Sequence, residues 1–325
     1  MGVLTLPLLV LLAGAEPLPD ALPNIWVLPP APPLRIEPVV LEGVSVVGAE
    51  PRYVSSTRLD KIGSIWAPVS VNGQGPYRLV LATGASHTAL TPHLAEALGI
   101  QADPTETMIL RGATGTATVP MVPVESLEVG DFLMEPQRLA VIPDALGGAD
   151  GVLGIDGLAD KRIHIDFRRD RITIERSKNQ RPGRGFSTIP VDLMQGLLVA
   201  DATMGGVPVK AIIDTGGQVT LGNLALRLAL AERRRGKGVQ EGKLDKVYGS
   251  TLDMQVGTRL ETPALELGSL LVRSSEMTFA DFEIFKYWKM TDVPAMLIGM
   301  DVLGLLDTLI IDYRRRELQV RLPRR

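Results

Sequence analysis

Two short segments of the chain carry the same kinds of side chain in the same order, 132 residues apart. The first reads Leu-Val-Leu-Ala-Thr-Gly-Ala and ends at Ala85; the second reads Ala-Ile-Ile-Asp-Thr-Gly-Gly and ends at Gly217. Only the second holds an ionisable group, Asp214, and the equivalent position in the first is Ala82. A carboxylate directly after an apolar strand is a candidate general base, because it can take a proton from a water molecule within hydrogen-bond distance.

The repeat extends beyond these two loops. Residues 67–85 align with residues 199–217 without a gap, and each copy has a Gly-containing turn and a proline before the apolar strand. Residues 150–158 and 295–303 form a second pair, in which two apolar residues precede a glycine, and a strand with a central aspartate follows each. Two matches in the same order predict two copies of one β unit.

The elements that position the loops are predicted to be mainly strands. Short apolar and β-branched runs alternate with Gly and Pro, which is typical of β-structure. Only two stretches have a helical pattern, residues 92–98 and residues 225–235. The clearest strand predictions are residues 77–81, 119–124, 171–175, 207–213 and 317–322.

An apolar strand that ends in Asp-Thr-Gly, with a later apolar-apolar-Gly partner and the whole arrangement duplicated, resembles the two-lobed pepsin/retropepsin-like aspartic peptidases of the exported bacterial type. The resemblance covers roughly residues 64 to 325. It implies a mainly β fold with two homologous lobes of the six-stranded type, related by a pseudo-two-fold axis, and few short helices.

The resemblance also implies the chemistry of the loops. In this family two aspartates hold one water molecule and share a proton, because two like charges so close together cannot both ionise. The threonines are expected to bond the backbone of the opposite loop, and the glycines to allow tight turns and close packing. The supporting residues assigned in this way are Thr83, Gly84, Thr215, Gly216, Gly154 and Gly299.

Each copy contains a candidate flap, a hairpin that would cover a bound peptide. In the first copy the flap is centred on Gly112 and Gly115. In the second it is centred on Tyr248 and Gly249, a pair that resembles the tip of a pepsin-like flap. Ordinary surface hairpins are the alternative interpretation for both segments.

Ala82 departs from the family pattern and decides the predicted activity. Without a carboxylate at position 82, Asp214 loses the like-charge neighbour that would raise its pKa, and we expect it to be ionised at neutral pH. The chain is therefore predicted to be an aspartic endopeptidase scaffold, inactive or crippled as a monomer, for extended peptides or unfolded proteins. Three explanations of Ala82 remain open: an inactivated variant, a natural pseudopeptidase that binds peptides, or pairing of the second lobe with that of another chain.

Other chemistries find little support. The chain has no Cys and three His residues without metal-ligand spacing, so neither a metal nor another cofactor is expected. A net charge of −3 and basic runs without interleaved aromatic residues do not favour nucleic acid. Ser86 and His87 are adjacent and lack the G-x-S-x-G frame of a serine nucleophile. Four recurring aspartates suit turns and structural hydrogen bonds better than a metal: Asp156, Asp166, Asp301 and Asp312.

The N-terminal part predicts export to a periplasmic or extracellular space. An apolar run from Val3 to Leu12 precedes Ala13-Gly14-Ala15, a pattern typical of a cleaved signal peptide, which would leave no stable membrane span. Eight prolines between residues 17 and 38 favour an extended tether or a propeptide-like segment. The predicted organisation is a signal peptide (1–15), a Pro-rich segment (16–63), an N-terminal lobe (64–176), a linker (177–188) and a C-terminal lobe (189–325).

Overall fold

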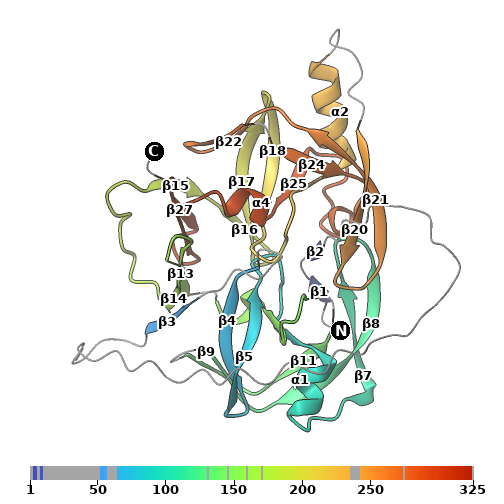
Figure 1. Cartoon of the computed structure of the whole chain (residues 1–325), viewed down its shortest axis with the longest axis vertical. Coiled ribbons are helices and arrows are strands. Elements are labelled where there is room, and N and C mark those ends of the chain that lie inside the picture. Colours follow the sequence, from blue (N-terminus) through green and yellow to red (C-terminus); the bar gives the residue numbers. More distant parts are fainter. Residues whose placement is uncertain are drawn as a thin grey trace, which may run out of the picture.

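The computed structural model confirms that the chain is mainly β (Figure 1). The strands lie in three sheets, and the helices are few and short. The residues that the structure describes are 3–5, 8–9, 52–56, 64–129, 132–144, 146–158, 160–169, 171–234, 242–273 and 275–323.

The first sheet contains the predicted strand that leads to Ala82. Its strand β4 (Trp66–Val71) alternates buried and half-buried residues, as expected when one face of a sheet packs on the core. From one edge to the other the order is β1 (Val3–Thr5), β7 (Asp103–Arg111), β8 (Thr116–Val124), β11 (Gln137–Val141), β6 (Ala89–Leu90), β12 (Gly151–Leu153), β5 (Gln74–Leu81), β4 (Trp66–Val71), β9 (Leu127–Val129) and β10 (Phe132–Met134).

The second sheet contains the strand that leads to Asp214, and its order matches that of the first sheet strand for strand. In both sheets the strand before the loop pairs in parallel with the strand that ends at the apolar-apolar-Gly segment. The order is β2 (Leu8–Leu9), β20 (Lys243–Gly249), β21 (Met254–Glu261), β24 (Glu276–Phe279), β19 (Leu221–Gly222), β25 (Ala295–Ile298), β18 (Val207–Ile213), β17 (Leu197–Met204), β22 (Leu265–Leu267) and β23 (Leu270–Val272), and β16 (Asp192–Met194) pairs with β17 beside this path.

A third sheet of six strands joins segments from both halves of the sequence. Its order is β15 (Ser187–Pro190), β27 (Glu317–Arg321), β26 (Thr308–Asp312), β13 (Lys161–Asp166), β14 (Arg171–Arg176) and β3 (Arg52–Ser56). Where β13 meets β26, the buried Arg162 is 3.1 Å from the buried carboxylate of Asp312, which also accepts a hydrogen bond from Ser177. The two residues lie directly opposite each other in the pairing of β13 with β26, so both buried charges are paired and hydrogen-bonded, as buried charges must be.

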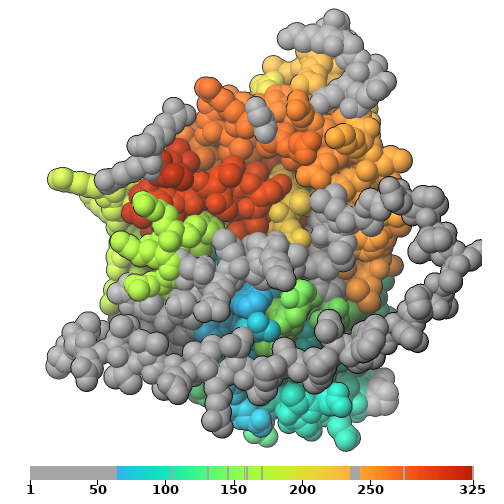
Figure 2. Space-filling model, viewed as in Figure 1, coloured from blue at the N-terminus to red at the C-terminus, as the bar shows by residue number. Residues whose placement is uncertain are grey.

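The sheets occupy different parts of the molecule. In Figure 1 most of the first sheet lies in the lower part, most of the second in the upper part, and the third on the left. On the face drawn in Figure 2, residues of the second sheet and of the C-terminal part form the upper surface, coloured yellow to red.

Two of the helices are those predicted, α1 (Pro92–Ala97) and α2 (Leu224–Arg233). The prediction that only two stretches are helical is wrong, since α3 (Glu283–Tyr287), α4 (Met300–Leu303) and the 3₁₀ turn η1 (Ile155–Gly157) are also present. These three are five residues or shorter, which is too few for a helical repeat to be visible in the sequence.

Most of the predicted export signal and Pro-rich segment lies outside the described residues. From that part the structure describes the strands β1, β2 and β3, none of which was predicted. No helix within the described ranges is long and apolar enough to span a membrane. Export therefore stays a prediction.

Candidate active site

The threonines of the loop after β5 and the loop after β18 join the two loops through four hydrogen bonds. The hydroxyl of Thr83 donates to the carbonyl of Ile213 (2.8 Å) and accepts from the amide of Thr215 (3.1 Å). The hydroxyl of Thr215 donates to the carbonyl of Leu81 (2.7 Å) and accepts from the amide of Thr83 (3.2 Å). Both threonines are fully buried, so these bonds are shielded from water and hold the two loops together.

Each loop is positioned by the centre of its own sheet. The amide of Ala82 donates to the carbonyl of Leu153 (3.1 Å), and the amide of Asp214 donates to the carbonyl of Ile298 (3.0 Å). These bonds continue the parallel pairing of β5 with β12 and of β18 with β25. The strands on both sides are buried and apolar, which leaves the loops little freedom to move.

The carboxylate of Asp214 accepts hydrogen bonds from both loops. One oxygen accepts from the amide of Gly216 in its own loop (2.9 Å) and from the amide of Gly84 in the other loop (3.2 Å). A Cβ atom on Gly84 would lie 2.5 Å from the carboxyl carbon of Asp214, closer than any side chain allows. Glycine is therefore required at position 84 for the carboxylate to come this close.

Burial raises the pKa of Asp214 to about 6, although backbone amides of Gly216, Gly84 and Gly217 partly oppose the rise. Only 1% of the residue is exposed, so the charged form loses most of its hydration. The carboxyl is mainly ionised at pH 7, as expected. The like-charge neighbour that would raise the pKa is absent, as the sequence implies, and burial raises the pKa instead.

Ala82 is 0% exposed and lies in an apolar cluster with Val80, Leu110 and Ile142. Its methyl group offers no hydrogen-bond partner to its own loop. The amide of Gly84, the counterpart of Gly216, accordingly donates across to Asp214. The two loops together thus provide one carboxyl group, which can accept a proton but has no acidic partner at the equivalent position.

Gly154 lies directly behind the first loop. Its amide donates to the hydroxyl of Thr88 (3.1 Å), which in turn donates to the carboxylate of Asp156 (2.8 Å). The same three-residue arrangement supports the second loop: Gly299, Thr220 and Asp301. The sequence analysis missed both threonines, although they are also 132 residues apart and could have been found by extending the repeat by three residues.

The recurring aspartates have structural roles, as predicted. Asp156 and Asp301 hold the threonines just described, and burial raises the pKa of Asp301. Asp166 and Asp312 each accept a hydrogen bond from the amide three residues later, which closes a turn (3.0 Å in both). His87 is exposed, with its Nδ1 atom 3.9 Å from Asp156.

The four flap candidates lie at the tips of two hairpins that touch. The amide of Gly112 donates to the carbonyl of Gly115 (2.8 Å) in the turn between β7 and β8. Tyr248 and Gly249 end β20, and the turn to β21 follows. The hydroxyl of Thr114 in the first tip donates to the carbonyl of Asp253 in the second (2.9 Å), so the structure brings both segments together.

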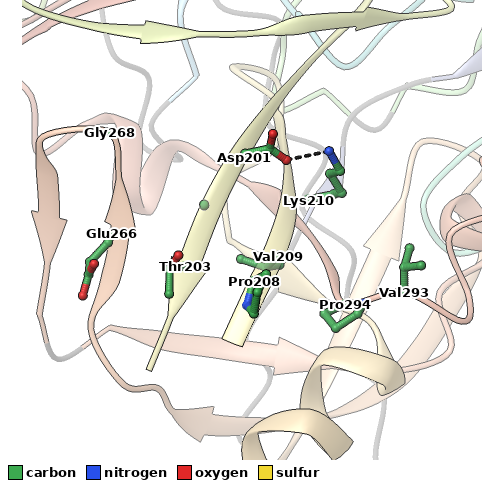
Figure 3. Close-up of a pocket in the computed structure, with 10 residues that line it drawn as sticks. Asp201, Thr203, Pro208, Val209, Lys210, Glu266, Gly268, Val293 and Pro294 are labelled. Atoms are coloured by element: carbon green, nitrogen blue, oxygen red, sulfur yellow. Dashed lines mark hydrogen bonds and ion pairs between the residues drawn. The ribbon is translucent and has the colours of Figure 1, made fainter. Parts of the chain in front are cut away.

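An open hollow of about 480 Å³ lies on the second sheet, and sequence reasoning gave no sign of it. Figure 3 shows Asp201 and Lys210, from the neighbouring strands β17 and β18, joined by an ion pair at its rim. Thr203 and Glu266 also line it. None of the residues that line this hollow is among the predicted site residues.

Residues 67–156 match a family model described as aspartyl protease. The matched range includes the loop from Ala82 to Gly84 and also Gly154, and it ends before Asp214. A comparison with curated proteins found no match. Over residues 67–156 the chain is therefore similar to the aspartyl proteases, which supports an aspartic peptidase family and a hydrolase.

Proposed function

We propose that the chain is a two-lobed aspartic-type endopeptidase scaffold that binds extended polypeptide between its lobes. Ala82 makes it inactive or crippled as a monomer. The observation that carries the proposal is the reciprocal bonding of Thr83 and Thr215, which aligns the two loops and leaves Asp214 as the one carboxyl group between them. The match of residues 67–156 to aspartyl proteases supports the same scaffold.

Asp214 would act as a general base. Its pKa of about 6 leaves it mainly ionised at neutral pH, so it can take a proton from a water molecule. The reaction also needs a proton for the scissile carbonyl, which the partner carboxyl would supply. Losing one such acid–base group lowers a rate by about 10²–10⁴. We therefore expect the protein to bind polypeptide between its lobes and to cleave it slowly or not at all.

Two short strands from one N-terminal segment support extended polypeptide as the ligand. Val3–Thr5 pairs in parallel with residues 109–111 of β7. Leu8–Leu9 pairs antiparallel with Tyr248 and Gly249 of β20. Both hairpins therefore accept an added strand through main-chain hydrogen bonds, a mode of recognition that is tolerant of sequence.

A natural pseudopeptidase that binds peptides without cleaving them is the second candidate, favoured by the full burial of Ala82 in an apolar cluster. Pairing of Asp214 with the same residue of another chain is less favoured. It would have to replace all four bonds between Thr83 and Thr215 and their partners. We further propose an exported, monomeric protein.

The test is to supply the missing carboxylate with Ala82→Asp, using Ala82→Asn as a control of matched shape. The new carboxylate can accept a hydrogen bond from the backbone amide of Gly84, as the carboxylate of Asp214 accepts one from the backbone amide of Gly216. We expect the Asp variant to cleave a labelled unfolded protein with a bell-shaped profile on the acid side of neutrality, since one carboxyl must be protonated and the other ionised. The Asn variant should not cleave, and adding Asp214→Ala should abolish the activity.

The outcome separates the two candidates. Cleavage by the Asp variant alone establishes the peptidase scaffold. A folded Asp variant that binds a labelled extended peptide, measured by fluorescence anisotropy, and cleaves nothing between pH 3 and 8 establishes the binding module instead. If neither the unchanged protein nor the Asp variant binds or cleaves polypeptide, both candidates fail.

A further inference from the structure

Helix α3 is present in the second half of the molecule and has no counterpart among the described residues of the equivalent connection in the first. Fifteen residues (280–294) connect β24 to β25, whereas nine (142–150) connect β11 to β12. Two aromatic side chains anchor α3 in the core of the second sheet: Phe285 and Trp288 are buried, with ring centroids 6.2 Å apart in an edge-to-face arrangement. The helix is thus a fixed part of the second half.

The tip of the first hairpin, residues 111–116, docks on this helix. The amide of Ile284 donates to the carbonyl of Ala113 at 3.4 Å. The guanidinium carbon of Arg111 lies 4.8 Å from the centroid of the Tyr287 ring, within the range of a cation–π interaction. Ala113 is only 2% exposed, and the Nε atom of Arg111 is buried with no hydrogen-bond partner among the described residues. The aromatic ring is therefore an important partner of this charge.

The tip of the second hairpin, residues 249–254, has no such support from the connection between β11 and β12 in the first half. From the N-terminal segment, Leu8 of β2 pairs with Gly249, just as Thr5 of β1 pairs with Arg111 of the first hairpin. Thr114 bonds Asp253, and Ser250 and Thr251 pack on Gly112, so these contacts of the tip end on the first tip. Just beyond the tip, the side chain of Gln255 donates an exposed hydrogen bond to the carbonyl of Asp281 (2.8 Å), which holds the start of β21. Within the described part of residues 142–150, no hydrogen bond, ion pair or cation–π contact reaches the second tip. Leu252, at the end of the second hairpin, is 60% exposed.

We propose that Tyr287 and Ile284 form a latch that holds the first hairpin on the second half of the molecule. When the two tips separate, the Thr114–Asp253 bond breaks, the first hairpin stays on α3, and the tip of the second hairpin moves. Opening is therefore one-sided, although the two sheets have the same strand order. If the proposed function holds, a peptide enters beneath the second hairpin.

Hydrogen–deuterium exchange of the full chain tests the latch without any need for cleavage or a bound peptide. The amides of Gly112 and Gly249 are a matched pair, because each donates to a carbonyl across its own turn. We expect the amide of Gly249 to exchange at least about tenfold faster than that of Gly112, since local opening sets the rate. Equal rates, or faster exchange at Gly112, would overturn the proposal.

Substitution of the ring identifies the residue responsible. Tyr287→Leu removes the aromatic face and should raise exchange at Gly112 about threefold to tenfold, as expected for loss of a cation–π contact, with no change at Gly249. Tyr287→Phe keeps the face and should leave both rates close to those of the unchanged protein. Equal effects of the two substitutions would contradict the latch.

A second pair of variants covers the case in which Tyr287→Leu fails to fold. Arg111→Met removes the charge from the hairpin side and should raise exchange at Gly112 by the same factor, whereas Arg111→Lys retains a cation and should change it less. If Met and Lys behave alike, the cation–π contact does not hold the hairpin.

Discussion

The loop after β5 and the loop after β18 are held by the same bonds and differ in the residue that begins them. In both, the first residue bonds the neighbouring parallel strand, and the threonine bonds the backbone of the opposite loop. Ala82 begins one loop and Asp214 the other. The backbone thus keeps its position without the first carboxylate, because threonine, glycine and the buried strands hold it. The acid–base chemistry therefore depends on the first residue of each loop, whereas the position of the backbone depends on the threonines, the glycines and the buried strands.

The same comparison extends to the segments that follow. Residues 142–150 and residues 280–294 occupy equivalent places in the two strand orders, and only the second contains a helix. Between strands an insertion is tolerated because the pairing of β24 with β19 and β21 does not depend on it. The repeated part of each unit is therefore its sheet, and the connections are free to differ.

The largest effect is expected from removing one of the shared hydroxyls. Thr83→Val or Thr215→Val keeps the shape and leaves a carbonyl and an amide of the opposite loop buried without partners. An unpaired buried group costs about 1–3 kcal/mol. We expect each variant to lower the free energy of unfolding by about 4 kcal/mol, measured by urea denaturation followed by tryptophan fluorescence.

The serine variants at the same positions are the control, since they keep the hydroxyl. Thr83→Ser and Thr215→Ser should cost much less than the valine variants. Because the bonds of the two threonines mirror each other, the two valine variants should agree closely. A large difference between them would show that the two loops are not held equally.

The next largest effect is the pH dependence of stability that comes from the carboxyl group of Asp214, which has no counterpart at Ala82. The pKa of Asp214 is about 6 in the folded protein, against about 3.9 for an unfolded aspartate. A raised pKa in an acid favours the folded state below the unfolded pKa, and this stabilisation is lost as pH rises through the folded pKa. With about 1.4 kcal/mol per unit, the full effect is about 3 kcal/mol, of which about 2 kcal/mol should be lost between pH 4 and pH 7.

Asp214→Asn isolates this contribution because the amide does not titrate. The difference in free energy of unfolding between the unchanged protein and the Asn variant should fall across this range and level off above pH 7. Other carboxyl groups affect both proteins alike and cancel in the difference. A difference that stays constant from pH 4 to pH 7 would mean that burial does not shift the pKa.

Much of this arrangement is visible in the sequence because it repeats. The strands that lead to Ala82 and Asp214 are apolar, end in Thr-Gly and recur at one spacing, so strand type and loop position could be predicted. The roles of Thr83 and Thr215 needed a known family for their interpretation, since spacing alone does not say which backbone a hydroxyl bonds.

Features made by contact between remote segments could not be predicted. Helix α3 is five residues long and has no side-chain N-cap, so it leaves no helical pattern. Its contact with Arg111 joins positions far apart in the chain and outside the repeat. The pKa of Asp214 depends on burial, which follows from the assembled fold and not from neighbouring residues.

The helices that follow the two loops provide the finest comparison. The hydroxyl of Thr91 caps α1 by accepting from Leu94 (3.3 Å), and it also donates to the carbonyl of Asp150 (3.0 Å). Its counterpart Asn223 caps α2 by accepting from Leu226 (2.8 Å). The side-chain amide nitrogen of Asn223 also donates to the carbonyls of Met290 and Val293, which follow α3 in the chain. Asn223 thus caps α2 and also anchors residues 280–294, the connection that is longer in the second half of the molecule.

Alanine at the two caps should therefore have unequal effects. Thr91→Ala should lower the free energy of unfolding by about 1 kcal/mol, the usual value for an N-cap. Asn223→Ala should cost about 2 kcal/mol, because the buried carbonyl of Met290 and the more exposed carbonyl of Val293 also lose their donor. Asn223→Ser separates the two roles: it keeps an uncharged side-chain oxygen for the cap and loses the side-chain amide, so it should retain the cap's share and lose only the anchor's. Equal costs for the two alanine variants, by urea denaturation at pH 7, would show that α2 is capped like α1 and that the longer connection is held by α3 alone.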